Sequence, residues 1–120
     1  MKPKIDGTEF GFITIEGTEF DHDVLIRLSG KIKKRKKKLS KAVFGTSHTI
    51  SIDEAEYIYE KAAEQLIIGT GQSGMVTLSP EASKYFKEKK IRADLSPTPD
   101  AVRKWNKAEG ATIGLFHVTC

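Results

Sequence analysis

Three glycines follow a short apolar run at the spacing G-x-G-x-x-G, which in some proteins brings the backbone close to a phosphate group. They are Gly69, Gly71 and Gly74, directly after the strand-like residues 66–68 (LII). A dinucleotide site would also need a helix that opens at the last glycine and an acidic residue about twenty positions further on. Asp94 lies near that distance, but residues 75–78 (MVTL) are β-like, so the next helix signal comes only at Ser79. A tight structural turn or a small-anion pocket is therefore favoured over a dinucleotide site.

Histidine and cysteine side chains are the other candidates for chemistry. His117 and Cys120 have a spacing that suits metal ligands, but a metal site needs three or four converging ligands and Cys120 is the only cysteine. Cys120 could act as a nucleophile with a histidine base, although the end of a chain is a poorly fixed position for catalysis. His117, beside the final strand, is expected to be packed or capped, and His22 to lie in a solvated turn. The sequence thus indicates no metal, no cofactor and no catalytic residue, and it leaves enzymatic activity undecided.

A run of basic residues, KIKKRKKKLSK at residues 31–41, dominates the charge of the chain. Eight of the 20 basic residues lie in it without an acidic one, so the other 12 are outnumbered by the 16 acidic residues. The run is interpreted as a solvated hairpin arm or edge strand, or else as a patch for phosphate, nucleic acid or an acidic partner. No aromatic residue interleaves it to stack on bases, which disfavours nucleic acid. The basic residues, none of which is expected to face a core, are Lys31, Lys33, Lys34, Arg35, Lys36, Lys37, Lys38 and Lys41.

Length and composition favour one domain that spans residues 1–120. No apolar run approaches the ~20 residues of a membrane span, and residues 1–10 lack the apolar centre of a signal peptide. A cytoplasmic protein without membrane contact is therefore expected, either as a monomer or as a homodimer. The abundance of Lys and Glu over Asn, Gln and Cys is typical of thermophile proteins.

The order of strand and helix signals predicts an α/β fold. Ser51, followed three residues later by Glu54, is a capping-box pattern that starts a helix. Two more helices are expected after Ser79-Pro80 and after Thr98-Pro99, with Ser79 and Thr98 as their N-caps. In chain order, the expected elements are strands at 10–15 and 20–28, a hairpin to Ile32, a helix from Ser51 to about Ala63, a strand at 66–68, an extended piece at 75–78, a helix from Pro80, a strand at 91–95, a helix from Pro99 to Gly110 and a strand at 112–118. This alternation in the second half implies a largely parallel sheet.

The predicted topology gathers polar residues at one edge of that sheet. A helix that leads into a parallel strand runs antiparallel to it, so three helix N-termini should meet the carboxyl end of the central strand near Gly69. Exposed amides at helix N-termini favour an anion. At least one glycine of the loop is expected at positive φ, and Gly71 is the chosen one. The predicted ligand-binding residues are His48, Ser51, Gly69, Thr70, Gly71, Gln72, Ser73, Gly74, Ser79 and Thr98.

Four segments resemble, in the same order, one known family. They are FGTSH (44–48), LIIGTGQSG (66–74), SPTPDAVRKWN (96–106) and GLFHVTC (114–120). The family is the small uncharacterised domain of archaea and bacteria whose eukaryotic relatives include the adipogenesis-associated domain protein and the third mitochondrial complex I assembly factor. The resemblance implies a three-layer α/β fold, with helices packed on a central mixed sheet of about five strands and an added N-terminal β-hairpin. At least one strand should then run against the others.

The resemblance carries no catalytic residue or cofactor, and the family's characterised members act in assembly or regulation. It therefore favours a non-catalytic binding or assembly module with a protein partner still to be identified. One alternative is a protein or enzyme that binds a small anion or phosphate ligand at Gly69–Gly74. A second alternative, disfavoured above, is nucleic-acid binding through Lys31–Lys41.

Overall fold

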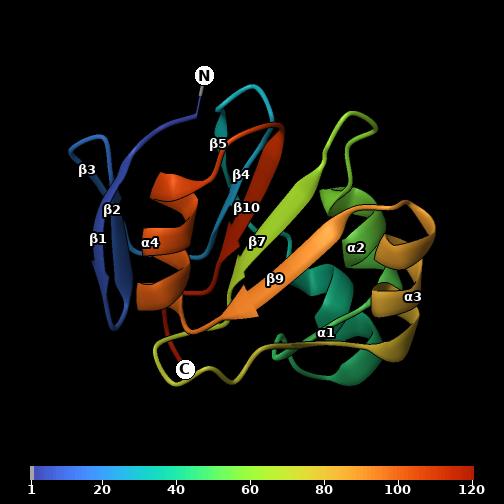
Figure 1. The fold of residues 1–120 in the computed structure, drawn as a ribbon. Coiled ribbons are helices and arrows are strands. Elements are labelled where there is room, and N and C mark those ends of the chain that lie inside the picture. Colours follow the sequence, from blue (N-terminus) through green and yellow to red (C-terminus); the bar gives the residue numbers. More distant parts are fainter. Residues whose placement is uncertain (1) are drawn as a thin grey trace.

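The computed structural model describes residues 2–120, which are built around a five-stranded mixed sheet (Figure 1). From edge to edge its strands are β5 (Ile32–Lys34), β4 (Val24–Ile26), β10 (Thr112–Phe116), β7 (Gln65–Gly69) and β9 (Arg92–Ser96). Strands β10, β7 and β9 are parallel, which confirms the parallel arrangement expected for the second half of the chain. The strand that runs against the others is β4, which pairs antiparallel with both β10 and β5.

One face of the sheet is covered by α1 (Lys38–Phe44), α2 (Ile52–Ile58) and α3 (Pro80–Glu88), seen on the right of Figure 1. Two short parallel strands, β6 (Thr49–Ile50) and β8 (Thr77–Leu78), lead into α2 and α3 and pair with each other. The core on this face takes alternate residues of β7, Leu66 and Ile68, together with Phe86 of α3. The apolar run that identified the central strand therefore supplies both faces of the sheet, since Ile67 points the other way.

The opposite face is covered by α4 (Thr98–Lys107) and by an antiparallel sheet of β1 (Ile5–Glu9), β2 (Phe12–Ile15) and β3 (Thr18–Phe20). The expected three-layer fold with an added N-terminal hairpin is thus confirmed, and β1 extends the hairpin of β2 and β3 to three strands. Trp105 of α4 is fully buried on β10, where a side chain at Gly114 would meet the indole ring at 2.8 Å. No helix within residues 2–120 has the length and apolar character to cross a membrane.

Several local expectations were wrong, and each has a physical reason. The helix from Ser51 ends at Ile58 instead of Ala63, because Arg27 Nη1 donates to the carbonyls of Tyr57 and Ile58 at 3.0 Å and closes the helix end. Helix α1 was not expected, since it lies beside the lysine run and has no side-chain cap. Strand β1 was also missed, since only its first residue is buried and no alternation is visible.

Candidate functional site

The loop of residues 69–74, called the glycine loop below, is tied to the segment at residues 117–120. The amide of Gln72 donates to the Thr119 carbonyl at 2.7 Å, and the amides of Ser73 and Met75 donate to the backbone oxygen of Cys120 at 3.1 and 3.2 Å. A small anion bound in the loop would need these same amides as hydrogen-bond donors. In this conformation they donate instead to the backbone oxygens of residues 119 and 120.

Gly71 sits at the centre of this contact and has φ +107°, which confirms the expected positive φ. A Cβ at Gly71 would lie 2.2 Å from the carbonyl carbon of Cys120, so only glycine fits here. Thr98, expected to cap α4, has another role. Its hydroxyl accepts from the Gly71 amide at 2.8 Å and donates to the His117 carbonyl at 2.6 Å, while Pro97 takes the cap position.

The predicted ligand-binding residues do gather at one edge, beside the carboxyl end of β7. The β6–β8 pairing brings the N-termini of α2 and α3 together, and the Thr98 amide donates to the Gly71 carbonyl at 3.0 Å. Ser51 and Ser79 are buried and act as N-caps, accepting from the amides of Glu54 and Ala82. In the loop, Thr70 is buried, Gln72 and Gly74 are half-buried and Ser73 is exposed. Whether this edge binds a ligand stays a prediction.

Beneath the same edge lies a buried ion network of Asp23, Arg35, Glu54 and His117. Arg35 donates to Asp23 Oδ2 at 3.0 Å and to both carboxylate oxygens of Glu54 at 2.7 and 3.0 Å. Asp23 Oδ2 also lies 2.7 Å from His117 Nδ1, and its Oδ1 accepts from the Val118 amide at 2.9 Å. Arg35 is only 4% exposed, so the expectation that the whole basic run avoids the core is wrong for this residue.

The network sets the charge state of its members. Burial alone would raise the pKa of Asp23, but the hydrogen bond and charge of His117, the Val118 amide and Arg35 together lower it from 3.8 to about 2. Burial alone would lower the pKa of Arg35, and the two carboxylates outweigh it and raise that pKa. The site therefore holds an ionised Asp23 beside a permanently charged Arg35.

The network continues in both directions. Ser40 of α1 donates to Glu54 and accepts from the Ser51 amide, which anchors α1 to α2. At the other end, Thr119 Oγ1 lies 3.1 Å from His117 Nε2. The order hydroxyl, imidazole, carboxylate activates a nucleophile in hydrolases. Here Asp23 is also bound by Arg35 and by the Val118 amide, and these bonds hold residues 117 and 118 in place beside the glycine loop.

Sequence reasoning did not find this network, although several of its residues had been noted for other reasons. Glu54 was identified only as a capping-box residue and Arg35 only as one of a run of cations. The one available signal was an Arg inside a Lys run, since Arg suits buried bidentate pairs with carboxylates. No group of three or more His, Cys, Asp and Glu side chains in the described chain is placed to hold a metal ion.

The basic run also forms an open surface cavity of about 490 Å³, lined by Lys34, Arg35, Lys36, Lys37, Lys38 and Lys41. Lys34 belongs to the edge strand β5, whereas Lys38 and Lys41 belong to α1, so the edge-strand interpretation holds only for the first part of the run. Lys36 is fixed over the Tyr57 ring, with Nζ 4.6 Å from the ring centroid. Further along α1, Val43 and Phe44 are 53% and 41% exposed. Phe44, three residues beyond Lys41, therefore exposes an aromatic side chain one helical turn from the cationic cavity.

Comparison with known proteins gives one family and a set of solved structures. A family model described as a protein of unknown function (DUF498/DUF598) matches residues 5–115. A conserved hypothetical protein from Pyrococcus horikoshii OT3 is 36% identical, with a TM-score of 0.88 over 98% of this chain and 99% of that chain. The protein MT938 is 27% identical, with a TM-score of 0.84 over 99% of this chain and 100% of that chain. A Mth938-like domain from Bordetella pertussis is 13% identical, with a TM-score of 0.65 over 97% and 85% of the two chains, which shows the fold alone.

Proposed function

This chain belongs to the DUF498/DUF598 family of proteins of unknown function, and we propose its role from the residues exposed on its own surface. The protein is a non-catalytic binding or assembly module, and its partner is an acidic segment of another protein. The binding site is the α1 surface, defined as Lys37, Lys38, Lys41 and Phe44 with the cationic cavity beside them. The observation that carries the proposal is the exposure of Phe44 one turn beyond Lys41, at the end of a cavity lined only by basic residues.

The geometry of α1 supports a partner with mixed chemistry. Lys37, Lys41 and Phe44 follow one another at i, i+4 and i+7, so they share one side of the helix. Protein interfaces combine an apolar or aromatic centre with a charged rim, and aromatic residues are enriched among their strongest contacts. A partner segment with acidic side chains and at least one apolar anchor would match both parts of this surface.

Charge also favours an acidic protein segment over a nucleic acid. Outside residues 31–41, acidic residues outnumber basic ones by 16 to 12, so a long polyanion would meet repulsion beyond the patch. A short acidic segment can stay within the patch. The cavity itself is held in shape because Arg35 is fixed by Asp23 and Glu54 from below.

The test uses a fluorescein-labelled peptide in which Glu alternates with Leu and Phe, and measures binding by fluorescence anisotropy. Saturable binding is expected for the wild type, weakened by added salt. Reversing Lys37, Lys38 and Lys41 to Glu should weaken it by at least about tenfold. The matched control reverses three exposed lysines elsewhere, Lys61, Lys84 and Lys87, which changes the net charge equally and should have a smaller effect.

A second pair of variants tests the apolar part. Phe44→Ser should weaken the peptide, whereas Phe10→Ser, at a residue 66% exposed on the N-terminal sheet side, should not. A DNA duplex of the same total charge is the competing probe. Tighter binding of the duplex than of the peptide, or equal loss in both lysine triples, would contradict the proposal.

A further inference from the structure

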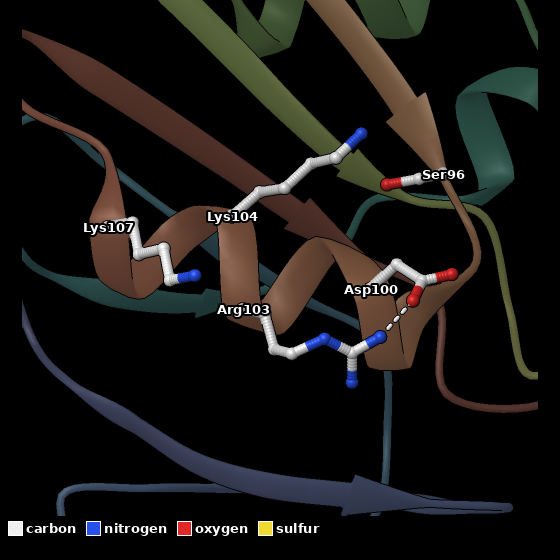
Figure 2. Close-up of a pocket in the computed structure, with 5 residues that line it drawn as sticks. All are labelled: Ser96, Asp100, Arg103, Lys104 and Lys107. Atoms are coloured by element: carbon white, nitrogen blue, oxygen red, sulfur yellow. Dashed lines mark hydrogen bonds and ion pairs between the residues drawn. The ribbon is translucent and has the colours of Figure 1, made fainter.

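The end of β9 carries a buried hydroxyl without a partner. Ser96 Oγ is shielded from solvent and makes no hydrogen bond within residues 2–120. Buried polar atoms in folded proteins are almost always paired, so an unpaired one marks a place where another group can supply the bond. Ser96 lines a surface cavity of about 340 Å³ between β9 and α4, together with Asp100, Arg103, Lys104 and Lys107 (Figure 2). We call this space the β9–α4 cavity.

Three cationic side chains, those of Arg103, Lys104 and Lys107, line the same cavity as that hydroxyl. Figure 2 shows the Ser96 hydroxyl directed from the strand toward α4, on the side where the Lys104 amino group lies. Lys104 Nζ is 3.1 Å from Asp94, and Arg103 is paired with Asp100 one turn earlier on α4. Lys107 forms no ion pair within the described chain. Three cations therefore face two carboxylates, which leaves an excess of positive charge around a hydroxyl that can donate.

The two ion pairs are open to exchange. The side chains of Arg103 and Asp100 are 65% and 49% exposed, and those of Lys104 and Asp94 are 46% and 43% exposed. Ion pairs in contact with water contribute little to stability, so a competing anion can replace the carboxylate in either pair. This differs from the buried ion network, where Arg35 and its partners are closed to solvent.

We propose that the β9–α4 cavity binds a phosphate monoester. Ser96 Oγ donates to one phosphate oxygen, and Arg103, Lys104 and Lys107 neutralise the others. Arg is suited to phosphate because its planar guanidinium donates two parallel hydrogen bonds. Arg103 is also a wall of a second cavity of about 260 Å³ lined by Asp6, Gly7, Thr8, Pro99 and Val102, which gives the organic part of a monoester a place to lie. The site is separate from the α1 surface and does not depend on the function proposed for it.

The test is an amide NMR titration of the full chain with inorganic phosphate, and then with phenyl phosphate, at constant ionic strength. Saturable shifts are expected at Ser96, Thr98, Arg103, Lys104 and Lys107, and phenyl phosphate should bind more tightly than phosphate. Ser96→Ala and Lys107→Gln should each weaken phenyl phosphate by at least about fivefold. The matched controls are Ser83→Ala and Lys87→Gln, a serine and a lysine on α3 that lie outside the cavity and the glycine loop, and both should bind as the wild type does.

Other outcomes would overturn the proposal. Shifts that do not saturate, or that sodium chloride reproduces, would show screening of surface charge without a site. Equal affinity for benzoate would remove the assignment to phosphate. Lys107 is exposed, so its replacement should leave the spectrum of a folded protein, and unchanged affinity in that variant would reject the cavity as the site. The variant in which Lys37, Lys38 and Lys41 are reversed to Glu should bind phenyl phosphate with the same affinity as the wild type.

Discussion

Arg35 Nε donates to Glu54 Oε2 across 2.7 Å, with both side chains 1% exposed. One of these residues comes from a run of cations and the other from the first turn of α2. Because of this contact, Arg35 is buried in the core, although it belongs to a run of cations that looks fully solvated in the sequence. The contact also holds Arg35 in place at the buried side of the cationic cavity. The lysines that line the cavity are less buried than Arg35.

Replacing Arg35 by Met should destabilise the fold strongly. The change leaves Asp23 and Glu54 buried without their cation, and removal of one partner from such a network costs about 3–5 kcal/mol. Chemical denaturation should show this loss in the free energy of unfolding. Lys38→Met, at an exposed position of the same run, should stay within about 0.5 kcal/mol of the wild type. Equal effects of the two variants would contradict the buried network.

Stability should depend on pH through Asp23. Its pKa is lowered from 3.8 in an ordinary setting to about 2 in the fold, so the ionised form stabilises the native state above about pH 4. This contribution, on the order of 2 kcal/mol, is lost as the pH falls from about 4 through about 2. Denaturation across that window should show a smaller decline in Asp23→Asn than in Asp21→Asn, whose residue is exposed. Identical pH profiles for these two variants would speak against the assignment.

Gly71→Ala should cost more than a glycine replacement at positive φ alone. Gly45 has φ +71° with open space around its Cα, so Gly45→Ala measures the backbone strain, about 1–2 kcal/mol. At Gly71 the added methyl group also meets the backbone of Cys120 and the His117 ring, so Cys120 must be displaced. Thermal and chemical unfolding should therefore rank the wild type first, Gly45→Ala second and Gly71→Ala last. A reversed order of the two variants would mean that the contact with Cys120 is weak.

Thr98→Val tests the link between α4 and the glycine loop. Valine keeps the shape of threonine but leaves the buried Gly71 amide and His117 carbonyl without the hydroxyl between them. The loss should be about 1–3 kcal/mol, typical of buried groups deprived of their partner. Thr77→Val, at an exposed strand position, is the control and should be near neutral. If Thr98→Val cost as little stability as the control, the Thr98 hydroxyl would not be a significant link between α4 and the glycine loop.

Local signals in the sequence were enough for the central sheet and for the edge of it where the predicted residues gather. The apolar run at 66–68 bounded by glycines, and the caps Ser51 and Ser79, each depend on nearby residues, and the structure has all of them. Gly71 was identified because a sharp turn after a buried strand requires positive φ. The parallel order followed from the alternation of helices and strands.

The unpredicted features depend on contacts between distant residues. Arg35 is buried because Asp23 and Glu54 meet it from 12 and 19 positions away, and the run distinguishes it only by being an Arg among lysines. Thr98 had a cap signature, yet its hydroxyl is taken by Gly71 and His117 across 27 and 19 positions. The acceptors for the loop amides come from residues 119 and 120, which no spacing rule connects to the loop.

The most direct test of the central claim is to map where the acidic peptide binds. Amide NMR spectra of the full chain should be recorded with increasing amounts of the Glu, Leu and Phe peptide. We expect saturable shifts at residues 34–44, centred on Lys37, Lys41 and Phe44, and little change at α4 or at the N-terminal sheet. Shifts centred on the β9–α4 cavity, or spread evenly over all exposed lysines, would contradict the α1 surface as the binding site.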